Sequence, residues 1–275
     1  MTNRDDSVVR DFGREWNSFD QAGVAAAELE REFGAYFAIF PWGKLPRHAR
    51  GFDLGCGSGR WAKLVAPRVG ELHCIDASAQ ALAVARKNLS GVTNVHLHQA
   101  SVEAMSLADG SMDFGYSLGV LHHVPDTAAG ILACARKLKP GAPLLLYLYY
   151  ALDNRPRWFR LIWLLSNLGR VAICRLPYGP KRLACELIAA LVYWPLARLA
   201  WLGERAGLVV DRWPLSAYRG RSFYLMRNDS LDRFGTRLEQ RFSRVEIERL
   251  MIAAGLEHIR FSEAAPFWCA VGYRS

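Results

Sequence analysis

The spacing of apolar residues changes repeatedly along the first half of the chain, and each change predicts a new element of secondary structure. Five apolar runs have the length of buried strands, at 51–54, 72–75, 95–98, 113–117 and 144–149. Between them, helical spacing begins near Arg60, after Ser78 and at Thr127, where Asp126 is a candidate N-cap. Strands that alternate with helices predict an α/β fold with a parallel sheet covered on both faces.

The two ends of the chain add elements to this series. Residues 1–10 are polar and we expect them to be loose, whereas aromatic residues recur with rough helical spacing over 12–40. Near the C-terminus, Ser243 and Glu246 form a capping box before an amphipathic helix. Two last strands are predicted by the apolar runs at 256–261 and 267–273.

Three glycines follow the first predicted strand at alternate positions, namely Gly55, Gly57 and Gly59. Glycine adopts positive φ without strain and has no Cβ, so a tight turn here lets a ligand approach the backbone closely. The helix that begins just beyond it offers unpaired N–H groups to ligand oxygens. Asp76 ends the second run, where a carboxylate accepts hydrogen bonds from ribose hydroxyls or helps to cap the next helix. The pattern favours a nucleotide-type cofactor site, with a plain tight turn as the alternative.

Four stretches, taken in order, resemble a known family. They are Phe-Asp-Leu-Gly-Cys-Gly-Ser-Gly at 52–59, Ile-Asp at 75–76, Met-Asp-Phe-Gly-Tyr-Ser-Leu-Gly-Val-Leu-His-His-Val at 112–124, and Leu-Lys-Pro-Gly at 138–141. Together they resemble the class I S-adenosylmethionine-dependent methyltransferases, and most closely the small-molecule type found in quinone biosynthesis. The resemblance implies a Rossmann-like, seven-stranded mixed sheet with helices on both faces and a final antiparallel hairpin.

The resemblance also implies how the chain divides. We expect an N-terminal helical cap over 1–47, a cofactor-binding core over 48–150, a mostly helical substrate-lid insertion over 151–235, and a C-terminal helix and hairpin over 236–275 that complete the core. The insertion then interrupts one domain rather than following it.

Cofactor-binding roles follow from the resemblance residue by residue. Asp53 stands where the family's acidic residue meets the ammonium side of the cofactor, and Asp76 stands where the ribose is bound. Ser101 replaces an aspartate that many relatives direct at the adenine amine, and its hydroxyl accepts a hydrogen bond without charge. The remaining cofactor-binding candidates are Gly55, Cys56, Gly57, Gly59, Ala77, Val102, Ser117 and Leu118.

The loop after the fourth predicted strand carries His122 and His123, and the fifth strand carries Tyr147 and Tyr149. These four are the candidate catalytic residues, because an alcohol or phenol acceptor needs a base. Packed or solvated loop histidines are the alternative. We predict no metal, since neighbouring residues point in different directions and His96 and His98 have no completing carboxylate or cysteine set.

The long segment after the fifth strand combines charge with apolar helix. The chain's formal net charge is +9, and 13 Lys and Arg against 5 Asp and Glu lie between Ala151 and Ser230. Its apolar runs, at 158–168 and 183–202, look too short or too charged to span a membrane. Three interpretations stay open: a helical lid, a surface that touches membrane lipid, and a homodimer surface. Interleaved charge and apolar helix argue against nucleic acid.

Residues of mixed aromatic and basic character are the candidates for holding the acceptor, which we expect to be a small lipophilic or anionic molecule. They are Trp16, Tyr36, His122, Tyr150, Arg155, Tyr218 and Arg219.

The predicted function is methyl transfer from S-adenosylmethionine, with the methylated atom open between O, N, S and C. A nicotinamide-dependent oxidoreductase is one alternative, but its fingerprint is G-x-G-x-x-G and this chain has G-x-G-x-G. A non-catalytic cofactor-binding module is another. Six cysteines without paired spacing, and no secretory signal, predict a cytoplasmic location, with peripheral membrane contact as an addition.

Overall fold

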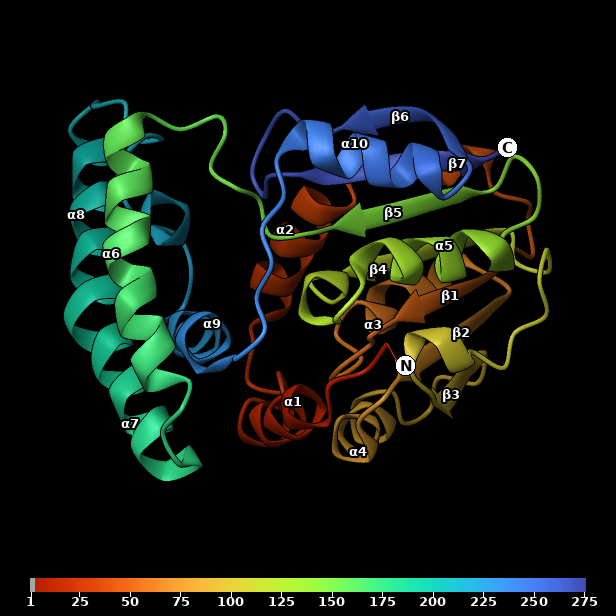
Figure 1. Cartoon of the computed structure of the whole chain (residues 1–275), viewed down its shortest axis with the longest axis horizontal. Helices are drawn as coiled ribbons and strands as arrows, with labels where there is room; N and C mark the ends of the chain where they lie inside the picture. The colour runs from red at the N-terminus through yellow and green to blue at the C-terminus, as the bar shows by residue number, and fades with distance from the viewer. Residues whose placement is uncertain (1–2) are drawn as a thin grey trace. The chain divides into compact units, whose positions relative to one another are not determined.

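The computed structural model describes residues 3–275, which divide into two compact units. The sheet unit comprises Met1–Ala151 and Leu238–Ser275, and the helical unit comprises Leu152–Arg237. Figure 1 shows the sheet unit as strands and helices, and the helical unit as helices joined by loops, without strands.

A seven-stranded mixed sheet forms the sheet unit, as predicted. Its strands are β1 Arg50–Leu54, β2 Glu71–Asp76, β3 Val95–Gln99, β4 Phe114–Leu118, β5 Pro143–Tyr147, β6 Leu256–Phe261 and β7 Cys269–Arg274. The spatial order is β3-β2-β1-β4-β5-β7-β6. The first five strands are parallel, and β7 pairs antiparallel with both β5 and β6. The order reverses between β1 and β4, and ligands of such sheets bind beside this reversal, outside the carboxyl ends of the strands.

The helices of the sheet unit lie between and beside its strands, and several of them begin at a side-chain cap. They are α1 Asp6–Ser18, α2 Ala26–Tyr36, α3 Ala62–Val65, α4 Ala79–Asn88, α5 Thr127–Lys137 and α10 Arg244–Ala253. The side chains of Ser78 and Asp126 accept the backbone N–H groups of Ala81 and Ala129, which caps α4 and α5. Ser243 and Glu246 form the predicted capping box of α10.

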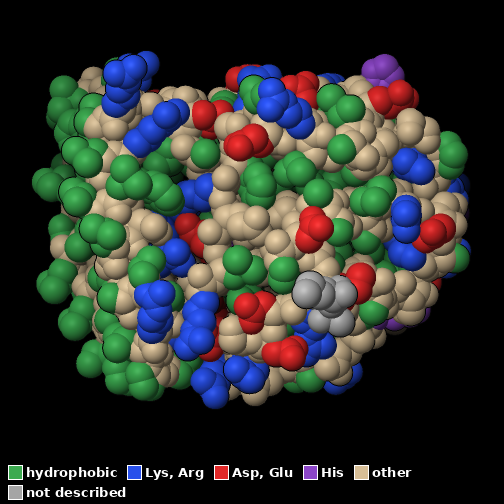
Figure 2. Space-filling model, in the orientation of Figure 1, with side chains coloured by type: hydrophobic (Ala, Val, Ile, Leu, Met, Phe, Trp, Pro, Cys, Tyr) green, Lys and Arg blue, Asp and Glu red, His purple; other side chains and the backbone are tan. Residues whose placement is uncertain are grey.

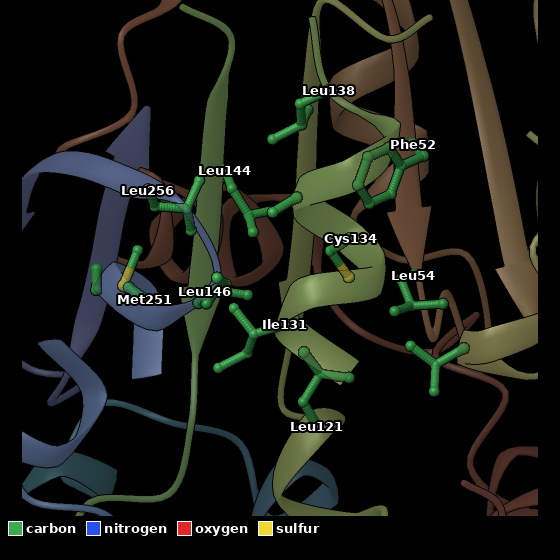
Figure 3. Close-up of a cluster of buried hydrophobic side chains, with 14 of the residues drawn as sticks. Phe52, Leu54, Leu121, Ile131, Cys134, Leu138, Leu144, Leu146, Met251 and Leu256 are labelled. Atoms are coloured by element: carbon green, nitrogen blue, oxygen red, sulfur yellow. The ribbon is translucent and has the colours of Figure 1, made fainter. Parts of the chain in front are cut away.

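Apolar side chains fill both faces of the sheet. On one face, α5 and α10 cover β1 and β5, and Figure 3 shows Ile131 and Met251 directed toward Leu144 and Leu146. On the other face, α2, α3 and α4 cover the central strands with Trp61 and other buried residues. These two cores hold the strand ends, and therefore the loops that follow them, in place.

Three expectations about element bounds were wrong. The polar start of the chain is helical from Asp6, because Asp5 caps α1 by accepting the N–H groups of Ser7 and Val8. Strand β5 ends at Tyr147 rather than Tyr149, because its pairing with β7 ends there. The helix after the glycines begins at Ala62 and lasts one turn before a 3-10 segment, η2 Ala66–Arg68.

The helical unit is helical along most of its length, as predicted for the segment after the fifth strand. It contains α6 Arg157–Ile173, α7 Tyr178–Ile188, the π-helical segment η5 Ala189–Tyr193, α8 Trp194–Arg205, the 3-10 turn η6 Ser216–Tyr218 and α9 Phe223–Gly235. Within it, α9 packs against α6, α7 and η5. Because α7, η5 and α8 run on without a break, the helix Tyr178–Arg205 is long and apolar enough to cross a membrane by length and composition alone. The apolar runs had looked too short for this.

Candidate active site

The glycine turn connects β1 to α3 in a conformation that side chains disfavour. The φ angles of Gly55, Gly57 and Gly59 are 76°, 54° and 77°. The N–H groups of Gly55 and Cys56 both donate to the carbonyl of Ile75, at 2.7 and 3.1 Å, which fastens the turn to the end of β2. Space is also short, because a Cβ on Gly57 would lie 2.8 Å from the Trp16 ring.

Asp76 at the end of β2 holds the turn through its carboxylate. One oxygen accepts the N–H of Gly57 at 3.0 Å and the other accepts the N–H of Ser78 at 2.8 Å. A carboxylate has about four acceptor positions, so both oxygens keep capacity for hydroxyl groups of a ligand. Burial raises the pKa of Asp76, and these two backbone N–H groups oppose that rise.

Asp53 places a buried carboxyl in β1, just before the turn. Its side chain is 1% exposed and accepts the hydroxyl of Tyr116 at 3.0 Å. Burial raises the pKa of Asp53 to about 8, and the nearby Asp76 adds to the rise, while the Tyr116 hydrogen bond and Arg60 oppose it. A cationic ligand group beside Asp53 would restore the charged carboxylate.

The other cofactor-binding candidates surround the same strand ends. Cys56 is buried in the turn, and Ala77 lies between Asp76 and the N-cap of α4. Ser101 precedes the 3-10 turn η3 Val102–Ala104, in which Val102 is buried. In β4, Ser117 donates to the carbonyl of Leu54 at 3.0 Å, and the neighbouring Leu118 packs in the core. The structure therefore brings these candidates to the carboxyl edge of β1, β2, β3 and β4, while their contacts with a cofactor stay predictions.

The loop after β4 joins the catalytic candidates to the glycine turn. It passes through Gly119, with φ of 79°, into the 3-10 turn η4 Leu121–His123. The side chain of Val120 fills the space where Gly55 has no Cβ. His122 and His123, which follow Val120 after Leu121, are therefore held close to the cofactor-binding turn.

An aromatic cluster continues from the histidines to the helical cap. His122 stacks on Tyr149 at 3.9 Å between ring centroids and lies 4.0 Å from His123. Tyr147 is 6.1 Å from Tyr149 and meets Tyr36 edge to face at 5.0 Å. The structure thus brings all four catalytic candidates together, with Tyr36 from α2 beside them.

The two histidines carry their protons on different nitrogens. The Tyr149 N–H points at His122 Nδ1 across 3.4 Å, so neutral His122 carries its proton on Nε2. That buried Nε2 has no hydrogen-bond partner among residues 3–275. Burial lowers the pKa of His122 well below 6.5, and His123 and Arg241 lower it further, so the ring is neutral near pH ~7. His123 Nδ1 lies 2.6 Å from the carbonyl of Leu238 and donates to it.

The substrate candidates separate into two groups. Trp16 lies on the glycine turn, and Tyr36 lies in the aromatic cluster. Tyr150 is just past β5, where its ring packs against Phe267 and the sheet core. His122, described above, also belongs to the sheet unit, and the remaining three candidates belong to the helical unit.

Within the helical unit these three side chains have protein partners. Arg155 donates to the carbonyl of Asp211 at 2.8 Å, and Arg219 forms ion pairs with Glu204 and Asp211. Burial raises the pKa of Tyr218 well above 10, and Asp229 raises it further as charge neighbour and hydrogen-bond partner. Their part in acceptor binding stays a prediction.

Several residues of the site escaped sequence reasoning. Arg241 places its guanidinium 5.3 Å from the Tyr149 ring centroid and donates to the carbonyl of Tyr150. Tyr116 looked like an ordinary strand residue, because nothing in the sequence places its hydroxyl on Asp53. Ser58 gave a signal, since it lies inside the glycine motif; its fully buried Oγ has no partner within the described range.

No group of three or more His, Cys, Asp and Glu residues is placed to hold a metal ion within residues 3–275. The histidines of β2 and β3 pair with each other and with a carboxylate instead. His73 Nδ1 is 3.0 Å from His98 Nε2, and His96 Nε2 is 3.1 Å from Glu71.

The chain is similar to known methyltransferases in both sequence and fold. Residues 52–146 match the family described as a methyltransferase domain. A ubiquinone biosynthesis O-methyltransferase of Pectobacterium atrosepticum is 30% identical over 205 residues, which cover 68% of this chain and 82% of that relative. The chain belongs to the class I S-adenosylmethionine-dependent methyltransferases.

Two further comparisons of this methyltransferase differ in how much of each chain they cover. A ubiquinone biosynthesis O-methyltransferase of Sodalis glossinidius is 34% identical over 127 residues, 45% of this chain and about half, 48%, of that relative. A solved S-adenosylmethionine-dependent methyltransferase of Thermotoga maritima is 16% identical, with a TM-score of 0.51 over 98% of this chain and 100% of that one. At that identity the likeness shows the fold alone.

The site of this methyltransferase fits the cofactor of its family, S-adenosylmethionine. Asp53 is a buried carboxyl that a ligand ammonium would stabilise, and Asp76 has spare acceptor capacity for ribose hydroxyls. The glycine turn keeps the positive φ angles that its glycines allow, and the side chains of Val120 and Trp16 occupy the space beside Gly55 and Gly57.

Proposed function

We propose that this methyltransferase methylates a hydroxyl oxygen on the ring of a small lipophilic acceptor. The observation that carries the proposal is the position of the loop after β4. Val120 of this loop lies against Gly55 of the cofactor-binding turn, and the histidines just after it pack with Tyr149. The relatives are O-methyltransferases by name, which supports oxygen as the methylated atom. S-adenosylmethionine supplies an electrophilic methyl group, so the protein chiefly aligns the acceptor and handles its proton.

The two histidines take different parts in this proposal. A hydroxyl loses its proton as its oxygen gains the methyl group, and a base within reach accepts that proton. His123 is the base, because its Nδ1 donates to Leu238 and a neutral ring then has its lone pair on Nε2. His122 carries its proton on Nε2 and donates a hydrogen bond to the acceptor oxygen. Tyr147 and Tyr149 pack against the acceptor ring.

The other candidate functions have less support. The family match and the glycine spacing disfavour a nicotinamide-dependent oxidoreductase. A non-catalytic module would bind the cofactor and transfer no methyl group, so the experiment below decides that alternative. The six free, buried cysteines support a reducing compartment, and the cytoplasmic location stays a prediction.

The test has two steps. Calorimetric titration with S-adenosylhomocysteine, the expected product, first establishes cofactor binding. Labelled methyl donor is then offered with prenylated catechols, their amine analogues and hydroxybenzoate-type acids. The proposal expects methylation of a catechol hydroxyl. With His123→Gln, kcat falls by about 10²- to 10⁴-fold at unchanged S-adenosylhomocysteine affinity.

His96→Gln is the matched control, because His96 lies on β3 and pairs with Glu71. It should leave kcat unchanged. Cofactor binding with methylation of amines only would overturn the hydroxyl acceptor, and binding without any transfer would favour the non-catalytic module. Equal loss in both histidine variants would remove His123 from the role of base.

A further inference from the structure

The helical unit buries several polar side chains among its apolar ones, and it exposes many large apolar side chains. Arg170 of α6 is 9% exposed and donates to Asn167 at 2.7 Å and to the carbonyl of Thr236 at 2.9 Å. Lys181 of α7 is 4% exposed, and the fully buried Ser230 of α9 donates to the carbonyl of Cys185. Globular proteins in water usually expose arginine and lysine, so the burial of Arg170 and Lys181 departs from the common distribution.

Leucines lie where the charged residues would be expected. Leu161, Leu165 and Leu168 recur along one side of α6, and Leu183, Leu187 and Leu191 recur along one side of the long helix. We call these six the leucine stripes; their exposure ranges from 51% to 71%. Of the 20 exposed large hydrophobic side chains among the described residues, 18 lie in the helical unit. The part of Figure 2 that draws this unit is correspondingly rich in apolar side chains.

Positive charge accompanies the stripes. Residues 152–237 contain 15 Lys and Arg against 6 Asp and Glu, an excess equal to the net charge of +9 of the whole chain. Arg157, Arg205 and Arg212 are exposed, and none of them forms an ion pair with a described carboxylate. Five of the nine tryptophans also lie in this segment. Exposed leucine with Arg and Trp beside it is the composition of helices that lie in the interface of an anionic bilayer.

The charge distinguishes the occupants of this surface. A symmetric dimer through this surface would bring together two helical units that each carry a net charge of +9, and this repulsion opposes it. A helix that crosses a bilayer would carry the Glu186 ion pairs with Arg182 and Arg227 into hydrocarbon, where charged groups are costly. A negatively charged lipid surface attracts the arginines and takes up the leucines to a shallow depth.

We propose that the helical unit docks on the surface of an anionic phospholipid bilayer, with the leucine stripes in the interface and the exposed arginines on the headgroups. Docking of this kind would deliver the chain to molecules dissolved in the bilayer. It does not depend on the proposed reaction, because lipid binding is measured without an acceptor.

The experiment is co-sedimentation of the purified full chain with preformed vesicles. One set contains phosphatidylcholine alone, and the other mixes phosphatidylcholine with phosphatidylglycerol. We expect binding to the mixed vesicles and at least about tenfold weaker binding to phosphatidylcholine alone. A triple variant, L165S/L168S/L191S, should lower the partition coefficient to mixed vesicles by at least about tenfold.

The matched control is V245S/I252S, which removes the two exposed large hydrophobic side chains of α10 in the sheet unit. It should bind mixed vesicles like the natural chain. Equal binding to both vesicle types, or unchanged binding by the leucine variant, would overturn the proposal. The natural chain could instead fail to bind vesicles and sediment as a dimer. If the leucine variant then sediments as a monomer, the leucine stripes form an interface with a second copy. If the chain associates with vesicles only when it is present while they form, the result would instead indicate that the helix Tyr178–Arg205 crosses the bilayer.

Discussion

Asp53 is a buried carboxyl of the cofactor site, and its burial raises its pKa to about 8. Its side chain is buried at the end of β1 with a hydroxyl as its hydrogen-bond donor, so its charge lacks full compensation until a cation arrives. A carboxyl of this kind weakens the free protein and strengthens binding of a cationic ligand. Sequence reasoning placed Asp53 in the site through its motif, but burial in the folded chain is the main cause of its raised pKa.

This carboxyl gives two pH-dependent expectations. Its pKa of about 8 exceeds the ordinary 3.8, so between those values the folded chain holds a proton that the unfolded chain has lost. The free energy of unfolding contributed by Asp53 therefore falls as pH rises through this window. Asp53→Asn should flatten that fall, measured as the melting temperature at about pH 5 and about pH 9.

Binding should also release a proton. Near pH ~7 the free carboxyl is largely protonated, and pairing with the ligand ammonium needs the carboxylate. Titration with S-adenosylhomocysteine in two buffers of different ionisation enthalpy should show release of up to about one proton. Asp53→Asn should abolish the release, while Asp113→Asn, which removes the partner of Lys139, should retain it. Equal proton release in the Asp53 variant would contradict the assignment.

A substitution of Gly57 tests whether cofactor binding needs the backbone conformation and the tight packing of the glycine turn. Alanine there meets both a positive φ and the Trp16 ring. We expect Gly57→Ala to weaken S-adenosylhomocysteine binding at least about tenfold, measured by calorimetry. Gly110→Ala is the matched control, because Gly110 also has positive φ, at 66°, and no atom lies within 4 Å of the added Cβ. It should cost stability of about 1 kcal/mol and leave affinity unchanged.

At the scale of elements, caps and apolar periods predicted most of the sheet unit. Ser78, Asp126 and Ser243 each begin the helix that they were expected to begin, because a side-chain oxygen so close in sequence reaches the first free N–H groups. The end of β5 was misplaced, because the apolar run continues through Tyr149 while the antiparallel partner ends opposite Tyr147. An apolar run in the sequence shows which residues can be buried, but the strand ends where its hydrogen-bonded neighbour ends.

The capping box gives an expectation at this scale. Ser243→Ala removes the acceptor of the Glu246 N–H and should lower the free energy of unfolding by about 1 kcal/mol. For a chain of this size the melting temperature should fall by about 2–4 °C. Ser90→Ala, at an exposed residue past α4, should leave it unchanged. A Ser243 variant that melts with the natural chain would show that α10 is held by packing alone.

The whole molecule divides its composition unevenly. The sheet unit is electrically balanced and buries its apolar residues, whereas the helical unit carries all the net charge and most of the exposed leucine. The two units therefore differ in character: the sheet unit holds the cofactor-binding candidates, and the helical unit has the surface that we propose docks on lipid. Both the expected cofactor site and the aromatic cluster belong to the sheet unit.

Hydrogen exchange should separate the two units. A bound ligand stabilises the closed form of its site, so backbone amides that exchange only when that site opens exchange more slowly. With S-adenosylhomocysteine we expect slower exchange at 55–59, 76–78 and 118–123, and no change over α6 and α8. Mixed anionic vesicles should slow exchange in α6 and α8 instead. Protection of α6 and α8 by the nucleoside alone would favour the lid interpretation of the helical segment.

The sequence by itself determined the local and ordered features of this protein. The glycines, the carboxylates after β1 and β2 and the caps are all short-range patterns, and their order along the chain was enough to indicate a methyltransferase. Tertiary structure decided the rest, because it depends on residues far apart in the sequence. Tyr116 meets Asp53, Val120 fills the space beside Gly55, and Leu238 orients His123 only after the strands pair. The outward direction of the leucines was also beyond the sequence, since helical spacing predicts an apolar side but not whether protein or solvent lies against it.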